Sequence, residues 1–205
     1  FQIPKEWNRY IAIDYGLDMF AAVFVAVDEH KKAYVFKEIH KSNLIVSEAC
    51  QMLKSFMRGE KYRAIYAPPD LWNRNRDTGK STAEIFYDGG IVLEKASNDR
   101  IGGWLNVKEW IKPKKVRHEQ TGELYEDCDL KIFSNCLNLI KNLPQLQHDE
   151  KNPNDCATEP HSITHITDAL RYFCVSQTQP TKIEKSIFKE FGFEVVEEMN
   201  RLGMI

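Results

Sequence analysis

Three apolar runs joined by short polar turns constrain the fold of this 205-residue chain more than any other feature. The runs are Tyr10–Asp14, Phe20–Val27 and Ala33–Ile39, and they are rich in β-branched and aromatic residues, as strands are. Only residues 15–19 and 28–32 connect them. A parallel return needs about a dozen residues. The three runs are therefore expected to form an antiparallel sheet.

The next segment is expected to add a strand in another direction. Apolar residues at helical spacing predict a helix from Ser42, its N-cap, to about Arg58, and Gly59 ends it. A fourth strand, Ala64–Ala67, follows and is broken by Pro68 and Pro69, with Asp70 directly after. Because a helix separates the third strand from the fourth, the fourth enters by a crossover, and the sheet is mixed.

The remaining segments supply the flanking helices. We expect helices at 81–88, 98–111 (capped by Asn98), 134–142 (capped by Ser134) and 162–176, strands at 91–93 and 130–133, and an exposed loop or hairpin at 112–129. The helix over 98–111 is expected to place Ile101, Trp104, Leu105 and Lys108 on one face. The fold class is thus α/β, with a central mixed sheet of five to six strands flanked by helices.

The ends of the chain differ from its middle. Residues 1–8 are polar, contain a proline and are interpreted as a linker remnant, and residues 9–178 as one domain. Residues 179–205 carry apolar side chains at helical spacing and predict a C-terminal helical segment. The chain starts at Phe1 rather than Met, which suggests that it was cut from a longer protein with an N-terminal partner domain.

Composition excludes several classes of protein. The longest apolar run, Met19–Val27, is about half of the ~20 residues that a membrane span needs. Five scattered cysteines with no C-x-x-C pair argue against a disulfide framework, and Cys128, Cys136, His148 and Cys156 lack the short spacings of a zinc site. The net charge of −2 means that nucleic-acid binding would need a local basic patch.

Three carboxylates from separate elements are the strongest functional signal. Asp14 ends the first strand, Asp70 follows the fourth, and Asp168 lies in the late helix. If the first and fourth strands are neighbours, Asp14 and Asp70 share one edge of the sheet, where ligands gather in α/β folds. Close carboxylates repel one another, and hard divalent cations such as Mg²⁺ or Mn²⁺ relieve that repulsion. Two such ions could support phosphodiester hydrolysis.

Each residue also has a simpler interpretation. An Asp after a strand is usually a turn former, which applies to Asp70. Asp168 could instead pair with Arg171 or Tyr172 on its own helix. His165, three residues before Asp168, points the same way, and it could assist a metal-bound water, contact phosphate or be an ordinary packed histidine. Asp155 and His161, just upstream, could support the site or only structure their loop.

The order of these residues resembles a known family. The carrying stretches are Ile11–Gly16, Lys80–Ile85 with Gly90–Val92, Lys95–Ala96, Asp99–Gly102 and, most specific, the string H-x-x-D-A-L-R-Y from His165 to Tyr172. Over residues 9–176 the chain is similar to the ribonuclease-H-like C-terminal nuclease domain of the large terminase subunits of tailed phages, which package DNA. The resemblance does not include the ATPase domain of those proteins.

That resemblance implies a metal-dependent endonuclease that cuts double-stranded viral DNA during packaging in the host bacterial cytoplasm. It implies two Mg²⁺ or Mn²⁺ ions: Asp14 would bridge both, Asp70 would hold one and Asp168 the other, with His165 in a supporting role. Asp77 and Glu84 remain weaker substitutes for Asp70. The implied partners are the ATPase domain, the portal and the small terminase subunit. The alternatives are a Holliday-junction resolvase, a transposase-like enzyme of the same fold, or a non-catalytic docking module.

A basic cluster is the best candidate for contact with DNA. It comprises Lys108, Lys112, Lys114, Lys115 and Arg117, opposed within the segment only by Glu109. Such runs are by default solvated surface, but an acidic metal site needs cations that attract phosphate. Trp110 and Tyr125 could line the same groove, whereas Trp104 is expected in the core.

The segment Thr78–Thr82 imitates the end of a phosphate-binding loop. Arg74 occupies the position where the full pattern has its first glycine, and no buried strand precedes it. We therefore interpret this segment as a loop that leads into the helix beginning near Ser81, and not as a nucleotide site.

Overall fold

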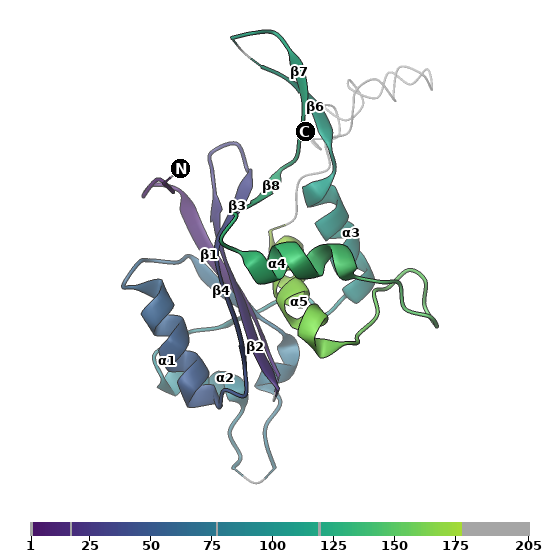
Figure 1. Cartoon of the computed structure of the whole chain (residues 1–205). Coiled ribbons are helices and arrows are strands. Elements are labelled where there is room, and N and C mark those ends of the chain that lie inside the picture. The colour runs from purple at the N-terminus through teal and green to yellow at the C-terminus, as the bar shows by residue number, and fades with distance from the viewer. Residues whose placement is uncertain (1, 17, 77, 119, 178–205) are drawn as a thin grey trace, which may run out of the picture.

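The computed structural model describes residues 2–16, 18–76, 78–118 and 120–177. A six-stranded mixed sheet in the order β5-β4-β1-β2-β3-β8 forms its centre (Figure 1). Its strands are β1 (Asn8–Tyr15), β2 (Met19–Val27), β3 (Ala33–Ser42), β4 (Ala64–Ala67), β5 (Glu94–Lys95) and β8 (Leu130–Ile132). The expected α/β fold with a mixed sheet is confirmed.

The register of the sheet fixes which residues lie at which end. β1, β2 and β3 are antiparallel, as predicted, and Asp14 lies opposite Ala21, which in turn lies opposite His40. β4 is parallel to β1, so the carboxyl ends of these neighbours meet at one edge. β5 and β8 extend the sheet by parallel pairing with β4 and β3. The sheet edge that carries Asp14 is therefore the edge at which β4 also ends.

Helices cover both faces of the sheet. Figure 1 shows α1 (Val46–Met57) and α2 (Thr82–Asp88) on one face, with α3 (Arg100–Ile111), α4 (Leu137–Asn142) and α5 (His161–Ser176) on the other. Two short 3-10 helices, η1 (Pro69–Trp72) and η2 (Leu143–Gln145), complete the helical elements of the described residues.

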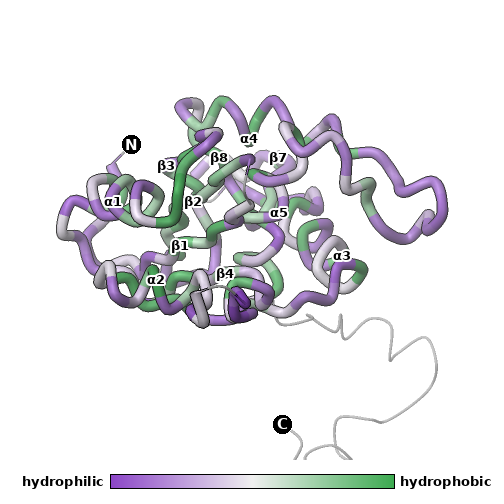
Figure 2. The backbone as a smooth tube through the Cα atoms, turned by 90° about the horizontal axis from the view of Figure 1, so that it is seen from below, coloured by the Kyte–Doolittle hydropathy of each residue, from purple (hydrophilic) through white to green (hydrophobic). Residues whose placement is uncertain are grey.

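The strand β2 lies at the centre of both cores. Its Val23 and Val25 belong to the core beneath α3, α4 and α5, and its Phe20 and Phe24 to the core beneath α1 and α2. A central strand buried on both faces reads as a continuous apolar run, which explains why β2 shows no alternation. Figure 2 shows that hydrophobic residues are concentrated in the strands of the sheet, with hydrophilic residues in the loops around it.

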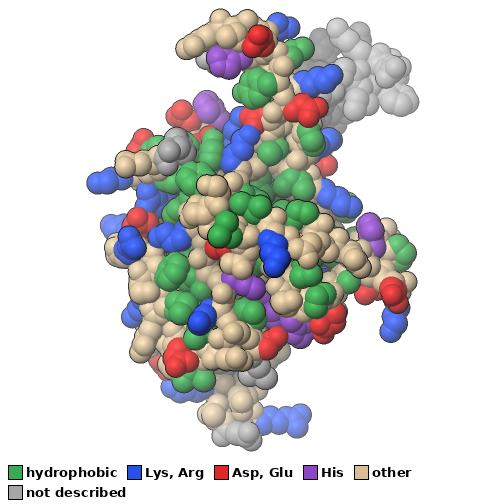
Figure 3. Space-filling view, viewed as in Figure 1, with side chains coloured by type: hydrophobic (Ala, Val, Ile, Leu, Met, Phe, Trp, Pro, Cys, Tyr) green, Lys and Arg blue, Asp and Glu red, His purple; other side chains and the backbone are tan. Residues whose placement is uncertain are grey.

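A two-stranded hairpin projects from the body of the molecule. It consists of β6 (Lys114–Arg117) and β7 (Leu124–Asp127), and it stands clear of the sheet in Figures 1 and 3. Asp127 anchors its base: the Lys32 ammonium lies 2.6 Å from that carboxylate, and Lys131 contacts its other oxygen. The segment 112–129, expected as a loop or hairpin, therefore contains a hairpin.

Several expected element boundaries were wrong. The helix expected from Ser42 begins at Val46, because β3 extends to Ser42; the Ile45 N–H is capped by the Glu48 carboxylate at 3.1 Å. The strand expected at 91–93 lies at 94–95, because Ile91 is buried against the core of α1 and α2 and its N–H donates to the Phe86 carbonyl.

The helix α3 differs from expectation in its cap and its buried face. Asp99, not Asn98, is the N-cap, and its carboxylate accepts the Gly102 N–H at 2.9 Å. The buried face contains Gly103, Trp104, Val107 and Trp110, whereas Ile101 and Leu105 are exposed. Trp104 is thus in the core, as expected, but the predicted single face was wrong. The α4 helix also starts later than expected, at Leu137 after Cys136.

The first eight residues were expected to be a linker and the last 27 a helical segment. Asn8 begins β1, and the Trp7 ring lies 4.9 Å from the Tyr34 ring, so the expected linker reaches the sheet at its last residues. The expected C-terminal segment 179–205 lies outside the described residues. Within the described part of the chain, no helix combines the length and apolar character that a bilayer crossing requires.

Candidate active site

Asp14 and Asp70 come from neighbouring parallel strands that end at the same edge of the sheet. Ala12 pairs with Tyr66, so Asp14 lies just beyond the part of β1 that pairs with β4, and Asp70 follows β4 in η1. The proline pair before Asp70 ends the strand and starts the 3-10 turn, because proline lacks the N–H that a strand ladder needs. Asp70 is exposed there, whereas Asp14 is largely buried.

The helix α5 brings the other two predicted residues to this edge. It packs on β1 and β2 through an apolar face that includes Ile166, Leu170 and Phe173. On the same helix, His165 Nδ1 lies 2.5 Å from the Asp14 Oδ2. Asp168, one turn further, is buried beside it. The structure therefore brings Asp14, His165 and Asp168 together, at the sheet edge that Asp70 borders.

The charges at this edge act on one another. Burial is the main cause that raises the pKa of Asp14, and the negative charges of Asp168 and Asp70 raise it further, against the lowering effect of the His165 hydrogen bond. A group of acids that repel one another in a partly buried place gains from a cation. Their oxygen donors are those that Mg²⁺ and Mn²⁺ prefer. Neutralisation by a hard divalent cation would relieve this repulsion.

His165 is held by the acids around it. Burial alone would lower its pKa, but the hydrogen bond to Asp14 and the charges of Asp14, Asp18 and Asp168 together raise it. Gly16 makes this packing possible: a Cβ at that position would lie 2.9 Å from the His165 Cε1. The glycine of the Asp14–Gly16 stretch thus leaves room for the imidazole.

Two arginines fix the orientation of Asp168. Its Oδ1 accepts the Arg171 Nε at 2.7 Å and lies 3.3 Å from the Arg100 Nη1. Arg171 is fully buried, and its guanidinium lies 4.4 Å from the Tyr172 ring centroid. The pairing with Arg171, one of the simpler interpretations of Asp168, is therefore present, but it occupies one carboxylate oxygen and leaves the other.

Arg100 links the site to the loop before α5. Its Nε donates to the Asp155 Oδ2 and its Nη2 to the Cys156 carbonyl, each at 3.0 Å. Asp155, considered from sequence as a supporting residue, thus reaches Asp168 through Arg100. Arg100 itself was not predicted from the sequence, although it lies in the Asp99–Gly102 stretch that carried the family resemblance.

Two remaining candidates from the sequence, His161 and Glu84, do not contact the three carboxylates among the described residues. His161 contacts Asp18, a residue not predicted from the sequence although it follows Asp14 by four positions. Glu84 caps α2 together with Ser81, so its carboxylate already bonds to a backbone N–H at 2.6 Å. That role makes it a poor substitute for Asp70. Asp77 lies outside the described residues. The segment before Ser81 is a loop that leads into α2, as expected.

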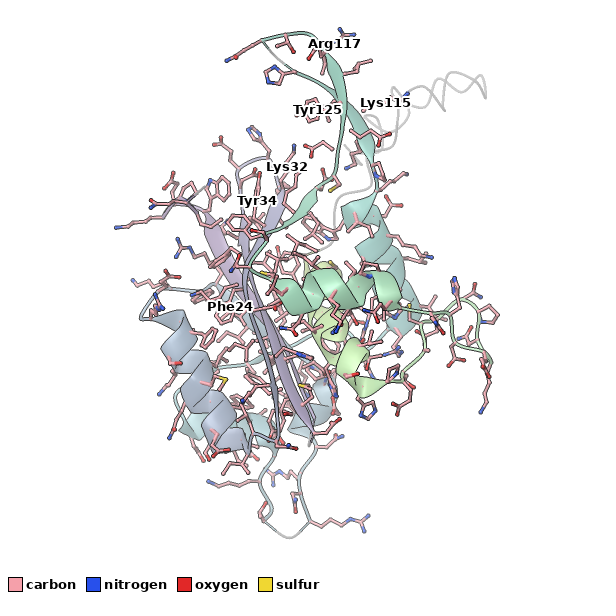
Figure 4. The ribbon with its side chains drawn as sticks, viewed as in Figure 1. Phe24, Lys32, Tyr34, Lys115, Arg117 and Tyr125 are labelled. Carbon is pink, nitrogen blue, oxygen red and sulfur yellow. The ribbon has the colours of Figure 1, made fainter. Side chains whose placement is uncertain are left out.

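The basic cluster lies at the other end of the sheet from Asp14. Lys114, Lys115 and Arg117 lie on the hairpin, whose chain continues into β8, where Leu130 pairs with Ala33. Ala33 is in register with Val27, and Val27 with Asn8, the first residue of β1. Figure 4 accordingly shows Lys115 and Arg117 beyond Lys32 and Tyr34, at the hairpin end.

Asp14 lies six residue steps along β1 from that level, or about 20 Å. Lys108 and Lys112, at the end of α3, are exposed like the hairpin cations, and Lys114 contacts Asp129. Trp110 is buried against Phe173 and so cannot line a groove, whereas Tyr125 is exposed. The cluster is therefore solvent-accessible but does not border the carboxylates.

The fold of this chain resembles that of two solved phage proteins. The chain is similar to the nuclease domain of the large terminase g2p of bacteriophage SPP1, solved with bound Mn, with a TM-score of 0.54 and 16% identity over 80% of this chain and 84% of that one. It is also similar to the large terminase nuclease of thermophilic phage G20c, with a TM-score of 0.50 and 15% identity over 86% of this chain and 85% of that one.

This chain has the ribonuclease-H-like fold of phage large-terminase nuclease domains. No protein-family model and no curated protein sequence matches it. At 15–16% identity, this similarity establishes the fold of the chain.

Proposed function

We propose that this chain is a metal-dependent endonuclease that cleaves double-stranded DNA during viral genome packaging. One observation carries the proposal: Asp14, at the end of β1, is buried among charges from Asp70 and Asp168 at one sheet edge, in the fold of terminase nucleases. The fold alone does not decide activity. The convergence of three acids from distant parts of the sequence at that edge supports it.

In this proposal Asp14 would contribute to holding both of two Mg²⁺ or Mn²⁺ ions, Asp70 would help to hold one and Asp168 the other. When bound, such ions lower the pKa of a coordinated water and stabilise the leaving oxygen of a phosphodiester. The Mn bound in the SPP1 domain supports the choice of ion. The pKa of Asp14 is raised first by burial and then by its acidic neighbours, so its ionised form is unfavourable in the free chain. A bound divalent cation would stabilise that ionised form.

The chain's own residues hold the carboxylates in place. His165 contacts the Oδ2 of Asp14 and leaves the Oδ1 for a ligand. Arg171 and Arg100 both approach the Oδ1 of Asp168, which leaves its Oδ2. Asp14 and Asp168 therefore each keep one oxygen in a fixed direction and one available, a form of preorganisation that removes the need to reorient during reaction.

DNA contact is proposed along α3 and the hairpin. Arg100 at the start of α3 bonds to Asp168, and the exposed Lys108, Lys112 and Lys115 lie towards its other end. The level of Asn8 and Leu130 already lies about 20 Å along β1 from Asp14, and the hairpin cations lie beyond that level. A duplex that touched both the carboxylates and the hairpin would therefore have to be about one helical turn, or 34 Å, in length or more. The ATPase domain, portal and small terminase subunit are proposed partners, and the host cytoplasm the proposed location.

Cleavage of supercoiled plasmid tests the proposal. The purified chain is expected to nick and linearise plasmid in Mn²⁺ or Mg²⁺ and to stop when EDTA is added. Asp14→Asn is expected to abolish cleavage, because it removes the carboxylate shared by both ions, while circular dichroism shows an unchanged fold. Asp88→Asn, an exposed acid on α2 that pairs with Lys80, is the matched control and keeps activity.

Two outcomes would contradict the proposal. Cleavage by Asp14→Asn at the wild-type rate removes the assigned metal site. Intact plasmid, together with no Mn²⁺ binding by calorimetry, favours instead a docking module that has kept only the fold. The binding measurement is needed beside the cleavage assay, because it separates a chain without a metal site from one that holds metal and cuts slowly on its own.

A further inference from the structure

A second donor cluster lies beside Asp14 and has a different chemistry. Asp18, His161 and His165 place one ligand atom each within 4.8 Å of one another. The His161 Nδ1 lies 3.0 Å from the Asp18 Oδ2, and the His165 Nε2 lies 3.4 Å from the Asp18 Oδ1. Figure 3 shows histidine and acidic side chains gathered over the first turns of α5. The three carboxylates offer only oxygen, whereas this cluster offers two nitrogens and one oxygen.

Helix geometry brings the two histidines to one face. His161 and His165 are four residues apart in α5, and their ring centroids lie 5.3 Å apart. Two histidines at this spacing on a helix are a common pair of zinc ligands. Asp18 comes from the connection between β1 and β2, so two elements distant in sequence supply the set.

The opposite nitrogen of each imidazole faces a carboxylate. The His165 Nδ1 contacts Asp14 at 2.5 Å, and the His161 Nε2 lies 3.1 Å from the Glu159 Oε1. Metal-binding histidines almost always donate their other ring N–H to such an acceptor, which fixes the tautomer. If each ring donates in this way, the two remaining nitrogens present lone pairs towards Asp18.

That arrangement needs positive charge between the rings and Asp18. The His165 Nε2 is buried from solvent and has no hydrogen-bond partner among the described residues. Two lone pairs facing a carboxylate repel it unless protons or a cation lie between them. Donors bound at about 2.1 Å in tetrahedral geometry lie about 3.4 Å apart. The distances from the two histidine nitrogens to the Asp18 carboxylate oxygens, 3.0 and 3.4 Å, therefore allow a metal ion to bind after small side-chain adjustments.

We propose that Asp18, His161 and His165 form a separate site for a zinc-class divalent ion. Imidazole nitrogen favours Zn²⁺ and related transition metals over Mg²⁺, which prefers oxygen. Water completes the coordination at this half-exposed position. The site is distinct from the three-carboxylate site of the proposed nuclease, and the two are joined through the Asp14–His165 contact. It does not depend on that nuclease activity.

Metal binding by the full chain in excess Mg²⁺ tests the site. Mg²⁺ occupies the oxygen ligands, and one equivalent of Zn²⁺ is still expected to bind in calorimetry. Co²⁺ in its place is expected to give the visible absorption of a nitrogen-ligated ion. His161→Ala and Asp18→Asn are each expected to weaken Zn²⁺ binding by at least about tenfold. His30→Ala, an exposed histidine on the β2–β3 turn, is the matched control and is expected to bind Zn²⁺ like the wild type.

Two results would overturn this site: Zn²⁺ affinity that is the same in His161→Ala, Asp18→Asn and wild type, or Zn²⁺ fully displaced by excess Mg²⁺. Plasmid cleavage separates this failure from that of the proposed function. His161→Ala is expected to cut DNA in Mg²⁺ like the wild type, because His161 contacts none of the three carboxylates. A chain that binds Zn²⁺ through His161 but never cuts DNA retains this site and loses the nuclease.

Discussion

At the scale of single residues, the ionisation of Asp14 depends on its neighbours. Burial and the charges of Asp168 and Asp70 oppose its ionisation, and the contact with His165 favours it. An ionised carboxylate in such surroundings destabilises the free protein and is stabilised when a cation binds. The stability of the metal-free chain should therefore report on the Asp14–His165 pair.

The pH dependence of unfolding tests this pair. The pKa of His165 is raised above its ordinary 6.5, so the folded chain binds that proton more tightly than the unfolded chain. The resulting stabilisation is fully present below about pH 6.5 and is lost as the pH rises through the raised pKa. The loss is about 1.4 kcal/mol for every tenfold difference in proton affinity between the folded and unfolded chain. Urea unfolding in EDTA is expected to show wild type losing more stability than His165→Gln between pH 6 and pH 9.

The exposed His30→Gln serves as the control in that experiment and should keep the wild-type slope. Equal slopes for wild type and His165→Gln would mean that the contact with Asp14 does not bind the proton more tightly in the folded state.

The places of the acids in the fold could be predicted from the sequence, but those of the groups that surround them could not. Asp14 lies near the end of an apolar strand, Asp70 follows one after two prolines, and Asp168 interrupts an apolar helix. Asp18 and Arg100 carry no such local signal. Their positions depend on how the β1–β2 connection and the start of α3 meet α5, which is a matter of tertiary packing.

At the scale of elements, α3 must approach α5 closely enough for Arg171 to be buried. Gly103 allows this approach, because a Cβ there would lie 2.8 Å from the Arg171 Cγ. Gly103→Ala is expected to lower the free energy of unfolding by about 1–3 kcal/mol, the usual cost of overpacking. Because Arg171 orients Asp168, the same variant should also bind Mn²⁺ more weakly. Urea denaturation and calorimetry measure the two effects.

Leu105→Ala is the matched control on the same helix. Leu105 is exposed, so its loss should change stability by less than about 0.5 kcal/mol. If Gly103→Ala is as stable as Leu105→Ala, the proposed crowding between α3 and α5 is wrong.

The exposed cations of the hairpin and the end of α3 are predicted to raise the affinity of the chain for DNA. Reversing two exposed charges in Lys112→Glu/Lys115→Glu should weaken binding to duplex DNA and flatten its dependence on salt. The slope of log K against log salt should fall by about 0.9 for each phosphate that the protein no longer neutralises. Fluorescence anisotropy in EDTA measures this without cleavage. Lys5→Glu/Lys61→Glu makes the same charge change at two residues outside α3 and the hairpin and should bind like the wild type.

Unchanged affinity and salt slope in the Lys112/Lys115 variant would leave the hairpin without a role in DNA contact. The proposed path of the duplex along α3 would then be wrong, although the carboxylate site would be unaffected.

Element positions were predictable where local signals were strong. The antiparallel arrangement of β1, β2 and β3 was predictable from the short turns between them, and α5 from its long periodic pattern. The errors fell where another element competed: Ser42 is a good cap but belongs to β3, and Ile91 looks like strand but packs under α1 and α2. Local preference cannot show which partner a residue will meet.

At the scale of the whole molecule, the fold unites residues 14, 70 and 168 at one edge and leaves the hairpin at the other. This shape suits a long, regular substrate more than a compact one. The chain is therefore expected to cut linear duplex at least as well as an immobile four-way junction, measured as initial rates on labelled substrates of equal length. Strong selectivity for the junction would instead favour a Holliday-junction resolvase.

The proposed chemistry requires that Asp14, Asp70 and Asp168 hold divalent metal ions together. Anomalous diffraction from crystals of the chain soaked in Mn²⁺ locates such ions at their ligands. We expect two manganese peaks, both within coordination distance of Asp14, one also contacting Asp70 and the other Asp168. Crystals with ordered side chains and no manganese at Asp14 would refute the metal site.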